Sequence, residues 1–169
     1  AETGKPGYSG RKRGDIQFRR MTVQHAGSGL WIHGQLASGN GEHLADLDDA
    51  LDTVVRTVER LAVDKDDVAV FADGEYNDVP SRHAARSRGL CLTSRVTRPE
   101  LLRNPEVLDR LRQAIWYEVS DSRSGPRRTA ADLGIMRIAA GKRTKTPAGD
   151  KYESIDVRVV ASRFARPND

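Results

Sequence analysis

The feature that most constrains the fold is a short apolar run at residues 68–72 that ends at Asp73-Gly74. A run of this length without polar alternation is typical of a central strand in a parallel sheet, buried on both faces. Patterns of a helix, a strand and a second helix follow it as far as residue 114. Such alternation of strands and helices predicts an α/β fold with a parallel component.

The segments before this run have clear periodicities of their own. Residues 15–24 and 30–36 alternate apolar with polar side chains around a turn-forming sequence, so they predict a β-hairpin. The alternation slips near Arg20 and Met21, which predicts a β-bulge there. In residues 42–62, seven apolar side chains fall on one stripe, which predicts a long amphipathic helix.

Two shorter helices and a strand are expected after the apolar run. Asp78 can cap a helix that has Pro80 in its first turn and is closed by Gly89. Residues 90–96 have the pattern of a strand, and a further helix is expected over residues 104–114.

The last third of the chain has a different pattern. Three strands are expected there, at residues 115–119, 133–138 and 154–164. Successive strands without helices between them indicate a small antiparallel β-insertion on the α/β layer. We therefore divide the chain into residues 1–114, an α/β core that begins with a loop-like arm at residues 1–14, and residues 115–169, a β-rich segment.

The excess of basic residues gathers in this N-terminal arm. The net charge of the chain is +4, and the first 20 residues hold six Lys and Arg against two acids. Basic arms commonly contact phosphate groups, and Arg11, Lys12 and Arg13 are the candidates here. A solvated, flexible terminus is the alternative, with equal weight.

The composition also argues against several classes of protein. No apolar run reaches the roughly 18 residues of a membrane helix, and no secretory signal is expected because no apolar segment follows the basic N-terminus. Cys91 is the only cysteine, which excludes an intrachain disulfide. The glycine-rich sequences at residues 27–29 and 39–41 lack the pattern of a nucleotide-binding loop. We expect a cytoplasmic protein without a membrane partner.

Asp73 is the residue on which a chemical function would depend. It lies where the apolar strand ends, and Gly74 allows the backbone to turn at once. Ligand-binding and catalytic groups of open α/β sheets gather at the carboxyl ends of strands. On this feature alone, an aspartate that bonds its own backbone in a turn is the alternative. For Glu75 and Asp78, which flank this residue, cap or turn roles are expected ahead of metal ligation.

Four stretches of the chain match a known family in order and spacing. They are PGYSGRKRG at residues 6–14, QLASGNG at 35–41, FADGEY at 71–76 and LTSRVTR at 92–98. Together they resemble bacterial insertion-sequence transposases of the DDE class, most of all the group whose catalytic domain carries a β-insertion. The resemblance implies a ribonuclease-H-like α/β fold, with a mixed sheet, flanking helices and a C-terminal antiparallel β-insertion. It implies DNA cleavage and strand transfer in transposition as the function.

The resemblance also implies a two-metal site. In this family two aspartates and a third acid bind two Mg²⁺ or Mn²⁺ ions, which activate water or a DNA 3′-hydroxyl and stabilise the leaving oxygen. Asp73 matches the second acid, so it is the implied catalytic residue and metal ligand. The strand of the first acid would precede residue 1, and the helix of the third would follow residue 169. We therefore expect a truncated chain that is inactive by itself.

Four arginines beyond the arm are candidate DNA contacts. Arg95 and Arg98 follow the predicted strand beside Asp73, and Arg127 and Arg128 lie in a predicted loop of the β-insertion. A solvated surface position is the alternative for each pair.

Two other functions stay open. A basic, non-catalytic DNA-binding remnant of a transposase would keep the fold in part and lose the chemistry. A small α/β protein unrelated to DNA would use Asp73 only as a turn residue. An unpaired hairpin edge would invite association, so a homo-oligomer also stays open as a partner.

Overall fold

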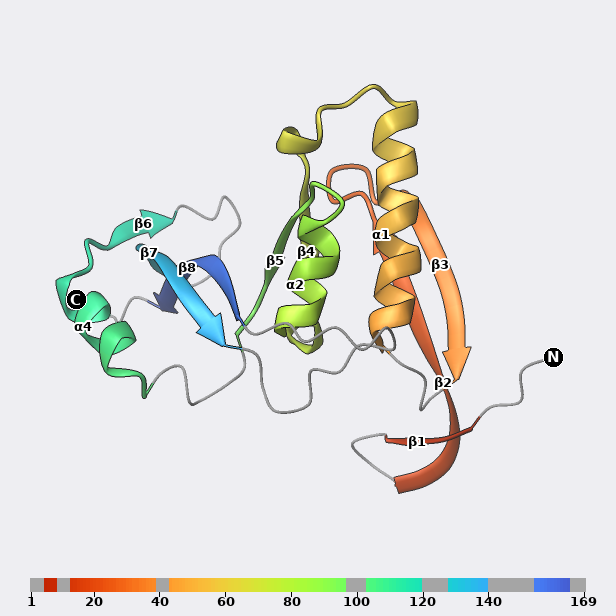
Figure 1. The fold of residues 1–169 in the computed structure, drawn as a ribbon, viewed down its shortest axis with the longest axis horizontal. Coiled ribbons are helices and arrows are strands. Elements are labelled where there is room, and N and C mark those ends of the chain that lie inside the picture. The colour runs from red at the N-terminus through yellow and green to blue at the C-terminus, as the bar shows by residue number, and fades with distance from the viewer. Residues whose placement is uncertain are drawn as a thin grey trace. The chain divides into compact units, whose positions relative to one another are not determined.

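The structure is a computed structural model that describes residues 5–8, 13–38, 43–96, 103–119, 128–139 and 154–164. It is a mixed α/β protein, with three α-helices and three small sheets in these ranges (Figure 1). The chain divides into two compact units, residues 1–95 and 96–169, and each is described by itself. Within the same ranges, no helix is long and apolar enough to cross a membrane.

An antiparallel sheet opens the first unit. It contains β1 (Lys5–Tyr8), β2 (Arg13–Gln24) and β3 (Trp31–Ser38), in that order. The predicted hairpin is confirmed as β2 and β3, but the shift in their register lies between Val23 and Gln24 instead of near residues 20 and 21. Part of the expected loop-like arm is also strand, because β1 pairs with the start of β2.

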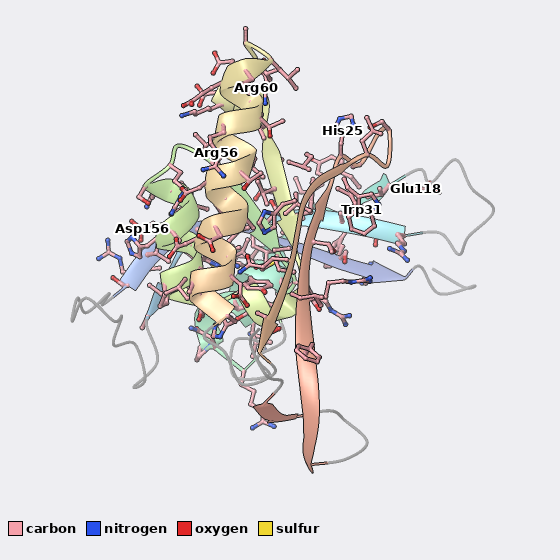
Figure 2. The ribbon with its side chains drawn as sticks, turned by 90° about the vertical axis from the view of Figure 1, so that its right-hand side faces the viewer. His25, Trp31, Arg56, Arg60, Glu118 and Asp156 are labelled. Atoms are coloured by element: carbon pink, nitrogen blue, oxygen red, sulfur yellow. The ribbon has the colours of Figure 1, made fainter. Side chains whose placement is uncertain are left out.

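The connection between β2 and β3 is a tight turn. The backbone N–H of Gly29 donates to the carbonyl of His25 at 2.8 Å, and the N–H of His25 donates to the carbonyl of Leu30 at 2.9 Å. Gly29 has a φ of 71°, which glycine adopts without the strain that a Cβ would add. His25 and Trp31 lie at this end of the hairpin (Figure 2).

Helix α1 (His43–Arg60) confirms the predicted amphipathic helix and packs on the hairpin. Four apolar side chains of the predicted stripe are buried, namely Leu47, Leu51, Val54 and Val58. Leu61 follows the last helical residue and is 68% exposed, so it does not belong to the buried stripe. Arg56 and Arg60 lie on the solvent-exposed side of the helix (Figure 2).

A parallel pair of strands, β4 (Ala69–Ala72) and β5 (Cys91–Ser94), completes the first unit. A short 3₁₀ helix, η1 (Lys65–Asp67), precedes β4, and η2 (Gly74–Tyr76) and α2 (Val79–Arg86) connect the strands. The predicted cap of α2 is confirmed, because the Asp78 carboxylate accepts from the backbone N–H of Ser81 at 2.9 Å. Gly89 closes the helical segment with a φ of 73°.

The prediction that residues 68–72 form a central strand buried on both faces is wrong for the described structure. Within the described ranges β4 pairs with β5 alone, and Phe71 is 75% exposed. Val70 and Ala72 pack against the core on the other face. An apolar run shows that a strand tolerates burial, but neighbouring elements decide whether both faces are covered.

One core lies beneath both sheets of the first unit. Met21 of β2, Tyr76 of η2, Leu90 before β5 and the buried stripe of α1 belong to the same cluster. The Tyr76 hydroxyl lies 3.9 Å from the Met21 sulfur, which links the hairpin to the segment after β4. The expected single mixed sheet is therefore present, in the described ranges, as two separate sheets that share a core.

The second unit confirms the antiparallel β-rich segment. Strands β6 (Tyr117–Val119), β7 (Arg128–Ala139) and β8 (Ser154–Phe164) form one sheet in that order. Helix α4 (Pro105–Gln113) packs on β7 through Val107, although we had grouped it with the first segment. Strand β7 begins earlier than predicted, so Arg128 opens a strand instead of lying in a loop.

Arg110 attaches α4 to an irregular point in β7. Its guanidinium donates to the carbonyls of Leu133 at 2.6 Å and Ile135 at 3.0 Å. Gly134 lies between them with a φ of 77°, where the register of β7 and β8 shifts. The arginine therefore satisfies two carbonyls at the bulge.

Arg88 joins α1 to the turn after α2 and makes stability depend on pH. Its guanidinium contacts Asp48 at 2.8 Å and Asp52 at 2.6 Å. The hydrogen bond from Arg88 lowers the pKa of Asp52 below its usual value. A lowered folded-state pKa stabilises the fold above the unfolded-state pKa of about 4, and this stabilisation is lost as the pH falls through the folded-state pKa.

We expect Asp52→Asn to be less stable than the parent at pH 7 and equally stable at the acid end of a pH series. The difference should stay below about 1 kcal/mol, because the Asp52 side chain is 51% exposed and solvent screens the pair. Urea unfolding between pH 2.5 and 7 measures it. The exposed Asp49→Asn serves as the control, and a deficit of Asp52→Asn that is independent of pH would contradict the ion-pair explanation.

Candidate functional site

The candidate site lies at the carboxyl ends of β4 and β5. These strands pair in parallel, with Ala72 opposite Ser94 at their last positions. Asp73 follows β4 and Arg95 follows β5, so topology brings these two predicted residues to the same end of the sheet. Side chains from different strands of an open α/β sheet converge at this end.

Asp73 is exposed and serves as the cap of η2. Its carboxylate accepts from the backbone N–H of Gly74 at 2.5 Å, and its carbonyl accepts from the N–H of Tyr76 at 3.0 Å. The turn role, which the sequence left as an alternative, is therefore present. Among the described residues, Gly74 is the only donor to this carboxylate, so its second oxygen remains available to a ligand.

Of the two neighbouring acids, Asp78 has the cap role that the sequence favoured. One oxygen of Asp78 caps α2, and the other lies 3.6 Å from Nε2 of His43. Glu75 is exposed on η2. Within the described ranges, no three His, Cys, Asp or Glu side chains are grouped to hold a metal ion.

Arg82 is the residue at this site that the sequence analysis missed. It lies on α2, and its guanidinium reaches the strand ends, where Nη2 donates to the Ser94 hydroxyl at 2.9 Å and Nε donates to the Asn77 carbonyl at 3.3 Å. Burial lowers the pKa of Arg82 from its usual value, and the nearby Asp78 charge acts in the opposite direction. In the sequence, its position in the first turns of the helix that follows Asp73 could have identified it as a candidate.

The described structure places the predicted DNA contacts in different elements. Arg95 is exposed, and its carbonyl accepts from the Asn77 side chain at 3.3 Å. Arg128 is exposed at the start of β7, in the second unit. Arg13 is the first residue of β2. Four predicted contacts lie outside the described residues: Arg11, Lys12, Arg98 and Arg127.

Two histidines make hydrogen bonds to neighbouring hydroxyl groups. His33 faces Thr53 on α1, with 3.2 Å between Nδ1 and the hydroxyl, and His25 bonds Ser28 within its own turn at 2.7 Å. Cys91 is exposed on β5. These residues have local structural roles or face solvent.

The two units differ in net charge, and the second unit has the larger excess of basic residues. Residues 96–169 hold 15 Lys and Arg against 10 Asp and Glu, whereas residues 1–95 hold 13 against 14. The acids of α1 and the segment after it offset the basic arm within the first unit. A second basic region therefore lies in the β-rich unit, and it is a further place where phosphate could be attracted.

Comparison with known proteins gave no match: no family model, no curated protein and no solved structure matches this chain.

Proposed function

We propose that this chain is part of a DDE-class DNA transposase, in which Asp73 is one acid of a metal-dependent phosphoryl-transfer site and DNA is the substrate. The observation that carries the proposal is an exposed aspartate at the carboxyl end of one of two parallel strands, with Arg82 and Arg95 at the same end. The order of hairpin, helix, strand, helix and strand before an antiparallel unit also agrees with the resemblance. A cytoplasmic setting belongs to this proposal.

The described residues match only part of the chemistry that such an enzyme needs. Two-metal phosphoryl transfer uses several carboxylates that converge on ions about 4 Å apart. Asp73 offers one open carboxylate oxygen, and no three-acid group accompanies it in the described ranges. We therefore derive no metal-dependent step for this chain by itself.

The metal role of Asp73 can be tested with Mn²⁺, whose unpaired electrons broaden nearby nuclear resonances. In the presence of DNA, Mn²⁺ should broaden the amide signals of residues 73–76, and Asp73→Asn should remove the effect. Asp64→Asn is a matched control, because Asp64 caps η1 at the other end of β4 and also accepts from a backbone N–H nearby. Equal broadening around both aspartates would indicate non-specific carboxylate binding and contradict the proposal.

Cleavage by the isolated chain is expected to be absent. Purified protein incubated with labelled DNA and Mg²⁺ or Mn²⁺ should give no more product than buffer, because one matched acid cannot hold two ions. Asp73→Ala should behave like the parent. Cleavage that disappears in Asp73→Ala would contradict this expectation and would make Glu75 and Asp78 the next candidate ligands.

A non-catalytic DNA-binding remnant is the second candidate function. The lack of a three-acid group in the described ranges favours it. This candidate shares DNA binding with the first but predicts no Mn²⁺ broadening around Asp73. The same experiment therefore separates the two.

A further inference from the structure

The guanidinium of Arg82 is fixed at the strand ends by neutral acceptors. Besides the Ser94 hydroxyl and the Asn77 carbonyl, Nη1 reaches the carbonyl of Leu92 at 3.5 Å. These contacts come from β5 and from the loop between η2 and α2. They hold the planar head in one orientation and occupy three of its five N–H groups, which leaves two donors for another acceptor.

Arg82 carries a charge that its surroundings do not neutralise by contact. It is partly buried, and no described carboxylate lies within ion-pair distance of it. Arg88, the other partly buried arginine of this segment, contacts both Asp48 and Asp52. Withdrawing a cation from water is unfavourable unless an anion compensates it. Arg88 therefore contacts its anions within the fold, whereas the charge of Asp78 acts on Arg82 without an ion-pair contact.

The position of Arg82 indicates where a further anion could contact its two remaining donors. Ser94 is the last residue of β5, and Arg95 follows it with an exposed side chain. The Asn77 side chain bonds the Arg95 backbone, so the loop after Asp73 and the end of β5 are joined. Two cations therefore lie at the same strand ends as Asp73, which are the usual ligand-binding end of an open α/β sheet.

We propose that Arg82 and Arg95 bind a phosphate group at the carboxyl ends of β4 and β5, and that this phosphate belongs to the DNA backbone. The identification of DNA as its source rests on the proposed function. The planar fork of Arg82 suits two oxygens of one phosphate, and its pre-set orientation reduces the entropy lost on binding. A phosphodiester held there would lie at the same strand ends as Asp73, and Arg82 would position it.

The first arm of the test uses inorganic phosphate and the parent protein. Phosphate added at constant ionic strength should cause a saturable shift of the Arg82 Nε–H signal in a nitrogen-15 correlation spectrum. Arg86, exposed on the same helix, should show no saturable shift. An Arg82 signal that phosphate and chloride affect equally would overturn the proposal.

The second arm measures DNA affinity at several salt concentrations. Arg82→Gln should weaken binding about tenfold, or about 1.4 kcal/mol, because it removes hydrogen bonds from a charged donor to the phosphate. It should also make the slope of log affinity against log salt shallower by about 0.9. Arg86→Gln should stay within about twofold of the parent, since its exposed head is free to move away from any one phosphate.

Arg82→Lys keeps the positive charge but loses the planar guanidinium. If Arg82→Gln does not fold, this variant tests whether the guanidinium binds phosphate. If Arg82→Lys folds and binds DNA more weakly than the parent with the same salt dependence, the result supports recognition of phosphate by the guanidinium. Parent-like affinity in Arg82→Gln or Arg82→Lys overturns the site while leaving DNA binding, and hence the proposed function, intact. A saturable phosphate shift without any DNA binding supports the anion site and removes DNA as its source.

Discussion

Replacing Leu51 with Ala is expected to lower the free energy of unfolding by about 3 kcal/mol, in the range found for large-to-small changes in protein cores. Leu51 is 1% exposed and lies in the middle of α1. Its side chain belongs to the core cluster beneath both sheets, together with Ala85 and Leu90. The substitution removes apolar contacts and leaves a cavity, so the effect should exceed a hundredfold change in the unfolding equilibrium.

Urea unfolding monitored by the helical circular dichroism signal measures this effect, because α1 is the longest described helix. Leu61→Ala is the matched control, since the same change at a position that is 68% exposed should cost less than about 0.5 kcal/mol. If both variants lost the same stability, the packing of α1 over the two sheets would be refuted. That outcome would also remove the support for a fixed site at the strand ends.

The second large effect is expected in the salt dependence of DNA binding. Six cations fall within residues 1–20, and each phosphate contact changes the slope of log affinity against log salt by roughly −0.9. If four of them engage, affinity should fall by about two orders of magnitude between ~50 and ~200 mM salt. Replacing Arg11, Lys12 and Arg13 with Ala should make the slope shallower by roughly three.

This triple substitution needs a control for the general loss of positive charge. Strand β1 pairs with the start of β2, so Arg13 lies in a strand instead of the expected loop-like arm. Arg56→Ala with Arg60→Ala removes two exposed cations from α1 and is the control for general charge. An unchanged slope in the triple variant would exclude the arm as the DNA contact and favour Arg127 and Arg128 in the more basic second unit.

Several local features could be predicted because a few neighbouring residues determine them. The apolar stripe of α1 is buried, as its spacing indicated, because one face of a helix must be apolar to pack on a sheet. Asp78 caps α2 with Pro80 in its first turn, and Gly89 closes the segment with a positive φ. The cap signals act within about one helical turn and the stripe lies within a single helix, so no knowledge of distant contacts is needed.

Other features depend on partners that are distant in sequence. The apolar run of β4 predicted two buried faces, but Phe71 is exposed because, in the described ranges, no element covers that face. The register shift of the hairpin lies between Val23 and Gln24 because the pairing of β2 with β3 decides its place, and alternation within one strand does not. Pairing with β2 likewise converts residues 5–8 from an expected loop into β1.

At the candidate site, too, some features could be predicted from the sequence and others depend on the tertiary structure. The sequence alone identified Asp73 as a carboxylate at a strand end and Arg95 as a cation after the next strand, because strand ends and turns are local signals. Only the tertiary structure placed them at one edge of a parallel pair and brought Arg82 across from α2 to Ser94. The difference between Arg82 and Arg88 was also invisible in sequence, since it depends on which carboxylates the packing of α1 brings within reach. Charge and residue type are properties of the chain, but whether a buried charge is compensated is a property of the fold.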